Sequence, residues 1–261
     1  RTIYMIDAES GELLWDARTQ TQGLSSTEMK NGFATDVRPI DRDANGFADL
    51  LYATDVGGRI WRFDFNEYNT TPDDFAKGGI IADINEPSKE DGNRRFFNSP
   101  DISLYTPTGV SNSQILVSVG SGYRAHPLST LTTDYHFLIR DLSGSQTPSE
   151  YTAVRMPDLE SWASGNASSV NGWYVPLQQN YEKVLADSVT SDGLVMFTTY
   201  APQNLDDPDT CEGDLGKARL YILDSKDPSG ENLQEELAIL LDDESDSETG
   251  GETGGETGGE T

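Results

Sequence analysis

One short pattern recurs along the chain and restricts the fold more than any other feature. Each copy has an aromatic residue, an alternating apolar run, an Asp and often a Ser-Gly turn; the copies occupy residues 2–15, 57–65, 134–144 and 217–230. Alternation at period two predicts a strand with one buried face. Further strands are expected at 49–56, 113–122 and 182–202, the last of them a hairpin turning at Ser191-Asp192-Gly193. The chain is therefore expected to be all-β.

The spacing of the copies predicts how these strands are grouped. The aromatic residues that mark the copies, Tyr4, Trp61, Phe137 and Tyr221, are 57, 76 and 84 residues apart. Repeated groups of strands favour radial repetition, as in a β-propeller. Because these separations exceed one plain blade, loops are expected to interrupt the blades at about 66–100 and 142–181. The chain is interpreted as part or whole of a modified β-propeller with loop insertions.

The end of the chain differs in composition from the rest. In "ENLQEELAILLDD" the leucines Leu233, Leu237, Leu240 and Leu241 share one face, which predicts a short amphipathic helix. From Asp242 onward the Glu-Thr-Gly-Gly repeats offer no apolar side chain to bury, so a disordered acidic tail is expected. The predicted organisation is a propeller domain over 1–241 and a tail over 242–261.

The charge balance excludes some partners. Asp and Glu number 45 against 18 Lys and Arg; without the eight acids of 242–261, the other 37 still outnumber the bases twofold. Nucleic acid is therefore not expected as a partner, because phosphate binding needs basic patches. An acidic surface suits a saline exterior, and cations are the expected ligands. No run approaches 18 apolar residues, so direct membrane insertion is not expected.

The chain is interpreted as a piece of a longer protein, because it shows no initiator Met and no basic-then-apolar signal region. Its one cysteine, Cys211, excludes a zinc framework and an internal disulfide. If the protein is exported, the disulfide partner of Cys211 is expected in a missing part; a free surface thiol is the alternative.

The stretch "DRDANGFAD" predicts a metal site. Counting Asp41 as position 1, oxygen-bearing side chains stand at positions 1, 3, 5 and 9, which are Asp41, Asp43, Asn45 and Asp49. Gly at position 6 permits a sharp turn, and Phe47 at position 7 can offer its carbonyl, as in the first half of an EF-hand loop. Position 12 is Tyr rather than Glu, so Asp49 is expected to close the site directly. The hard, flexible coordination of an all-protein oxygen site favours Ca²⁺ over Mg²⁺; the alternative is an ordinary Asp/Asn/Gly turn.

These residues also carry a family resemblance. "DRDANGFADLLYATDVGGRIWRFDF" resembles the calcium loop and following strands of the PilY/PilC family of type IV pilus tip-associated adhesins. Three more stretches match in order: "ILVSVGSGYRAHPLSTLTTDYHFLIRD", "GWYVPL…EKVLADSVTSDGLVMFTTYAP" and "CEGDLGKARLYILD", so that the resemblance spans about residues 2–225. The acidic tail has no counterpart in it.

The resemblance implies a modified β-propeller whose calcium loop influences pilus extension and retraction, and hence twitching motility and surface attachment. It implies export to the outer membrane and pilus tip of a Gram-negative bacterium, with pilins or minor pilins as partners. The adhesion target is left open, since the family's variable N-terminal region is missing from this sequence.

An enzyme is the alternative class. "IYMIDAESGELLW" also resembles the tryptophan-docking motif of propeller dehydrogenases that hold pyrroloquinoline quinone (PQQ), with Trp15 closing a blade. Those enzymes use several such motifs and a vicinal Cys pair, whereas this chain has one clear motif and one Cys. Trp15 is therefore interpreted as a blade-packing residue, and the chain as no enzyme.

Other chemically suggestive residues are interpreted as structural. His126 and His136 lack a second ligand at metal spacing, and Ser121 lacks a complete nucleophile-elbow motif. Gly120 and Gly122 are expected to end a strand, and Asp55, Gly57 and Gly58 to form the turn that follows the strand at 49–56. Asp7 and Asp64 are expected to cap turns, and the acidic clusters at 206–209 and 89–93 to be solvated loops.

Overall fold

A computed structural model gives the fold of the chain. The structure describes residues 1–25, 27–66, 71, 74–105, 113–144, 146–202, 216–225 and 228. Cys211, the acidic cluster at 206–209, the expected helix around Leu237 and the tail from Asp242 all lie outside these residues. In the part of the chain that is described, no helix is long and apolar enough to cross a membrane.

The described residues form four sheets with almost no helix. The first is a hairpin of β1 (Tyr4–Ile6) and β2 (Leu13–Asp16). In sheet I, an antiparallel meander is formed by β4 (Arg38–Ile40), β5 (Leu50–Asp55), β6 (Arg59–Phe65) and β7 (Ala76–Asp83). Two short strands pair with β7 in parallel, β3 (Thr21–Gln22) and β11 (Val154–Arg155).

The other two sheets follow along the chain. Sheet II has the order β12-β13-β10-β9-β8, from β8 (Asp101–Tyr105), β9 (Gln114–Gly120), β10 (Tyr135–Asp141), β12 (Glu160–Ser161) and β13 (Gly172–Pro176). Two 3₁₀ turns, Met156–Asp158 and Trp162–Ser164, flank β12. In sheet III, β16 (Leu194–Ala201) pairs with β14 (Lys183–Val184) and β15 (Val189–Ser191) on one side and with β17 (Lys217–Asp224) on the other.

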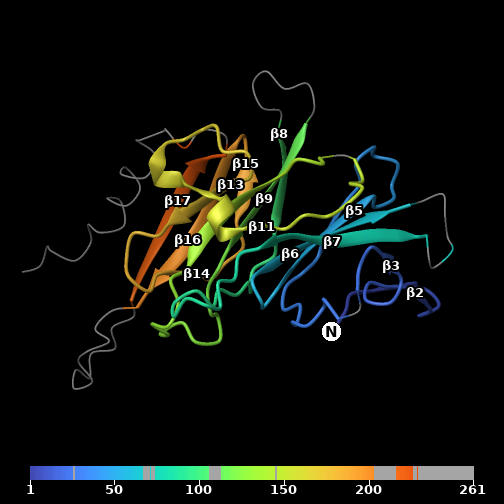
Figure 1. Ribbon diagram of the computed structural model, residues 1–261, viewed down its shortest axis with the longest axis horizontal. Helices are drawn as coiled ribbons and strands as arrows, with labels where there is room; N and C mark the ends of the chain where they lie inside the picture. Colours follow the sequence, from blue (N-terminus) through green and yellow to red (C-terminus); the bar gives the residue numbers. More distant parts are fainter. Residues whose placement is uncertain are drawn as a thin grey trace, which may run out of the picture.

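Sheet II lies between sheets I and III (Figure 1), and its two faces pack against these two neighbours. Alternate residues of one strand therefore enter different cores. Ile115 and Val117 of β9 pack with sheet I residues such as Tyr52, whereas Leu116 packs with sheet III residues such as Phe197. Sheet I is covered in the same way, because its other face packs on Trp15 of the hairpin. Strands buried on both faces need continuous apolar runs, which explains "QILVSVG".

The four copies of the sequence pattern fall in four different sheets, one copy in each. The copies at 57–65, 134–144 and 217–230 supply β6, β10 and β17, and the copy at 2–15 folds as the β1–β2 hairpin. The turn between β15 and β16 is confirmed: Ser191 pairs with Leu194, and the two turn residues have positive φ, 51° at Asp192 and 82° at Gly193. Such a pair defines a type I′ turn.

The expectation of loops at about 66–100 and 142–181 is wrong in part. The first range contains β7, and the second contains β11, β12 and β13. Two consecutive glycines, Gly78 and Gly79, interrupt the apolar alternation of β7. They are there for close packing: a Cβ on Gly78 would lie 2.6 Å from the Phe63 ring, and one on Gly79 would lie 2.6 Å from Tyr151. These strands complete sheets I and II, as the outer strands of blades do.

Candidate metal centre

The Asp-rich loop joins β4 to β5 at the end of sheet I. Its own carboxylates shape it: Asp41 accepts hydrogen bonds from the amides of Asn45 (3.2 Å) and Gly46 (2.8 Å), and Asp43 accepts from Asn45 (3.1 Å). The Asn45 side-chain oxygen accepts from the amide of Phe47 at 2.8 Å. Gly46 has φ of 95°, so it makes the sharp turn that the sequence predicts at position 6.

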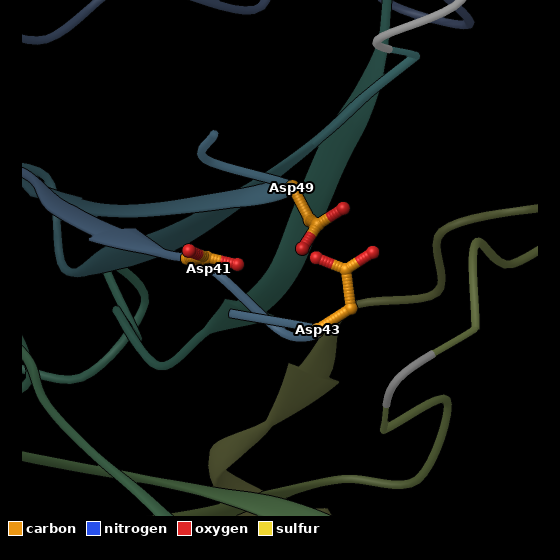
Figure 2. Close-up of side chains that lie close together, drawn as sticks. All are labelled: Asp41, Asp43 and Asp49. Carbon is orange, nitrogen blue, oxygen red and sulfur yellow. The ribbon is translucent and has the colours of Figure 1, made fainter. Parts of the chain in front are cut away.

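Three predicted ligands come together in this loop. Oxygen atoms of Asp41, Asp43 and Asp49 all lie within 4.8 Å of one another, and Figure 2 shows the Asp43 and Asp49 carboxylates turned toward each other. Two oxygens bound to one Ca²⁺ at about 2.3–2.6 Å can be at most about 5 Å apart. The spacing and the all-oxygen donor set therefore fit one calcium ion.

The two other predicted ligands are placed differently. The Asn45 oxygen already contacts the loop backbone, and the Asn45 amide donates to Asp43 at 3.1 Å. The side chain of Phe47 is 67% exposed, so apolar packing does not account for this residue. An Asn oxygen keeps a second lone pair for an ion, and the proposed ligand of Phe47 is its carbonyl. Both residues remain predictions as ligands.

Asp49 anchors the cluster in the sheet. Its amide donates to the Ile40 carbonyl and its carbonyl accepts from the Phe65 amide, both at 2.8 Å, so its backbone lies between β4 and β6. Its side chain is only 11% exposed, whereas Asp41 and Asp43 are exposed. An ion held by all three carboxylates would tie the exposed part of the loop to sheet I.

The local electrostatics favour charged carboxylates. Hydrogen bonds from backbone amides, chiefly that of Gly46, hold the pKa of Asp41 below its ordinary value. Arg42 provides a neighbouring cation: its amide donates to Asp49 Oδ2 at 2.6 Å, and its guanidinium lies 3.4 Å from Asp49 Oδ1. Asp49 and Arg42 also line a cavity of about 340 Å³ next to the loop. The sequence pattern did not predict this ion pair, although Arg42 lies inside the motif.

A buried ionic network joins sheets I and II and was not predicted from the sequence. Arg62 is fully buried and forms a two-pronged pair with Asp64, at 2.9 and 2.6 Å. It also reaches Asp141 at 2.7 Å, and Tyr52 and Tyr151 donate to the carboxylates of Asp141 and Asp64. The expectation that Asp64 caps a turn is therefore wrong, because Asp64 lies within β6 and faces Arg62. The alternation in "IWRFDF", which puts residues 62 and 64 on one face, was the available signal.

The structure confirms the structural interpretation of several other residues. Trp15 is buried and meets Phe63 and Phe65 edge to face, with ring centroids 5.4 and 5.2 Å apart. Asp7 accepts from the amides of Glu9 and Ser10, as a turn cap does. Asp55 accepts from the Gly57 amide in the turn between β5 and β6, also as expected.

The histidines and Ser121 also have structural settings. His136 is fully buried, stacks on Phe197 with centroids 3.8 Å apart, and shares a 2.8 Å hydrogen bond with Ser118. Burial lowers the pKa of His136 to about 3. His126 is exposed and rests against Tyr123, and Ser121 is buried and donates to Asp134 at 2.7 Å.

The stacked sheets define a modified β-propeller that carries an Asp-rich loop between the first two meander strands of sheet I. No family model matches the chain. Over 73 residues it is 37% identical to the type IV pilus biogenesis factor PilY1 of Pseudomonas aeruginosa (strain UCBPP-PA14); the match covers 27% of this chain and 6% of that protein.

A solved structure has the same fold. The crystal structure of the Pseudomonas aeruginosa PilY1 C-terminal domain matches with a TM-score of 0.58 and 18% identity, over 86% of this chain and 53% of that chain. The chain therefore spans about half of that domain. The all-β, modified β-propeller fold is confirmed, and so is the resemblance to the PilY/PilC family, since the two comparisons lead to the same protein.

Proposed function

We propose that this chain is a calcium-binding module of a type IV pilus biogenesis factor and tip adhesin, exposed at the cell surface. The observation that carries the proposal is the convergence of Asp41, Asp43 and Asp49 on one loop of a PilY1-like fold. The name of the similar protein, type IV pilus biogenesis factor, supports the pilus assignment. The partners proposed are pilins or minor pilins, and the surface or host ligand is left open.

The proposed role of calcium follows from charge. Three carboxylates within 4.8 Å repel one another, and a divalent ion removes most of that repulsion. Because Asp49 is fixed between β4 and β6 while Asp41 and Asp43 lie on the exposed loop, the ion would lock the loop onto the sheet. The loop is then rigid with calcium and open without it, so the surface of the pilus protein at this loop differs between the two states. Pilus extension, retraction and surface attachment would respond to that difference.

Calorimetry tests the ion site directly. Wild type should take up one Ca²⁺ with a Kd between about 10⁻⁶ and 10⁻³ M, the range of sensor and extracellular sites. Asp49→Ala should abolish this uptake, since it removes the one ligand anchored in the sheet. Asp36→Ala is the matched control, because it removes an exposed carboxylate from the preceding connection, between β3 and β4, outside the loop. Equal uptake by wild type and Asp49→Ala would place the site elsewhere.

The pilus assignment needs a separate measurement. The full-length protein carrying Asp49→Ala should change surface piliation or twitching in a cell that makes type IV pili, at unchanged protein level. Asp36→Ala should behave as wild type. If Asp49→Ala binds no calcium but piliation and twitching are normal, the ion site stands and its proposed role in the pilus is rejected.

A further inference from the structure

A cavity on sheet I gathers positive charge in a strongly acidic chain. The cationic cavity has a volume of about 510 Å³, and its lining includes Lys30, Arg59, Arg95 and Arg155. The chain has only 18 basic residues against 45 acidic ones, so four bases around one cavity is a marked concentration. Its lining contains a single carboxylate, Asp83, which pairs with Arg59 at 3.3 Å.

The strand register explains how the charges meet. In sheet I, Asp83 at the end of β7 is paired with Arg59 of β6 on one side and with Arg155 of β11 on the other. Neighbouring strands are about 4.8 Å apart, so the two arginines stand about 10 Å apart across Asp83. Lys30 comes from the connection between β3 and β4, and Arg95 from the connection between β7 and β8. Four segments distant in sequence thus bring cations to one place.

Three of these cations have no anionic partner among the residues that the structure describes. Among the residues that the structure describes, no carboxylate lies within 4.0 Å of the charged groups of Lys30, Arg95 or Arg155. Arg95 is nevertheless held in position, because its guanidinium stacks over the Tyr123 ring at 4.3 Å. Arg59 is held by the Glu28 carbonyl at 3.0 Å as well as by Asp83. Positioned cations that lack a protein counter-charge are suited to an external anion.

We propose that the cationic cavity binds an acidic peptide segment, with the carboxylates of neighbouring Asp or Glu side chains on the separate cations. A single small anion can reach one or two of these groups, whereas the spread of the cations over about 10 Å suits several carboxylates on one strand. The same chemistry is available from another protein or from residues 242–261 of this chain, which carry eight acids and no base. The proposal is independent of the calcium site, which lies on another loop.

A binding titration tests the cavity. Fluorescein-labelled hexaglutamate, followed by anisotropy at low salt, should bind the full chain, and hexaglutamine should not. The double variant Lys30→Gln/Arg155→Gln should weaken binding at least about tenfold, because it removes two charge-assisted contacts. Both side chains are exposed and form no ion pair with a described residue, so the fold should be kept. The control Arg124→Gln/Lys217→Gln changes the net charge equally at two exposed bases outside the cavity lining, and should stay within twofold of wild type.

Three results would overturn the proposal: no binding of hexaglutamate to wild type, equal loss in both double variants, or displacement by equimolar inorganic phosphate. A second variant distinguishes the two possible sources of the peptide. It is the full-length chain in which Asn and Gln replace the eight acids of 242–261. Tighter hexaglutamate binding by that chain assigns the cavity to the protein's own acidic segment. Unchanged binding assigns it to an acidic segment of another protein.

Discussion

The guanidinium of Arg62 in β6 donates a hydrogen bond to the carboxylate of Asp141 at the end of β10, with 2.7 Å between Nη1 and Oδ2. The two residues belong to sheets I and II, so this contact joins two blades through a fully buried cation. The charge is satisfied on all sides, because Asp64, the Gln146 carbonyl and two tyrosine hydroxyls complete the network around it. Burial, with the nearby charge of Asp141, raises the pKa of Tyr52, which keeps its hydroxyl a donor.

Removing this cation should destabilise the protein strongly. Arg62→Met would leave Asp64 and Asp141 buried without a counter-charge, and breaking such a pair costs about 3–5 kcal/mol of unfolding free energy. Arg38→Met is the control: its pair with Asp187 is 43% and 42% exposed, so its loss should cost less than about 1 kcal/mol. Urea denaturation measures both. Similar losses for the two variants would show that the buried network adds nothing specific.

Buried His136 should make stability depend on pH. Its folded pKa of about 3 lies below the ordinary value of 6.5, so only the unfolded chain takes up this proton as the pH falls from 6.5 toward 3. The contribution of His136 to stability should therefore be largest above pH 6.5 and fall below it. The effect is about 2 kcal/mol between pH 6 and pH 4.

The comparison of wild type with His136→Phe isolates this effect. Asp134 acts in the opposite direction, because burial raises its pKa to about 6 and stabilisation from its proton grows as the pH falls. That contribution is common to both proteins and cancels in their difference. Phenylalanine keeps the stacking on Phe197 and lacks the titrating group. Parallel stability curves for the two proteins between pH 7 and pH 4 would contradict the assignment to His136.

Arg42 should tune the calcium affinity. Its guanidinium lies 3.4 Å from Asp49 and competes with an ion for that carboxylate. Arg42→Gln keeps the backbone hydrogen bond to Asp49 and removes the charge, so calcium should bind several-fold more tightly in calorimetry. Arg124→Gln, an exposed base outside the loop, is the control for a change in net charge. Weaker calcium binding by Arg42→Gln would mean that the arginine supports the site.

The enzyme alternative has a chemical test. The protein mixed with pyrroloquinoline quinone and calcium should show no dye-linked oxidation of alcohols or sugars and no bound-quinone spectrum. The reason is that the sequence has one clear docking-like motif and one Cys, whereas those enzymes have several such motifs and a vicinal Cys pair. Saturable turnover accompanied by a quinone spectrum would replace the pilus assignment with a quinoprotein.

Local signals explain what could be predicted from the sequence. The alternating runs at 57–65 and 134–144 and the Asp192-Gly193 turn depend on neighbouring residues, and all three are as expected. The metal loop is equally local, because Asp41, Asp43 and Asp49 lie within nine residues. What could not be predicted depends on distant partners. Gly79 is typical of a loop in the sequence, and its place in β7 is explained only by its close contact with Tyr151. Asp64 is typical of a turn cap, and its place in β6 is explained only by Arg62, which pairs with both Asp64 and Asp141.

The short segment from β11 to β12 has a consequence for how the molecule folds. Residues 154–155 complete sheet I beside β7, about 70 positions earlier in the chain, and residues 160–161 enter sheet II beside β13. During synthesis, sheet I can therefore be completed only after β11 has emerged, and β11 follows β8, β9 and β10 of sheet II. Such long-range closure slows folding and makes the two blades interdependent. We expect sheets I and II to unfold together in one cooperative step, unlike the independent units of a linear repeat array.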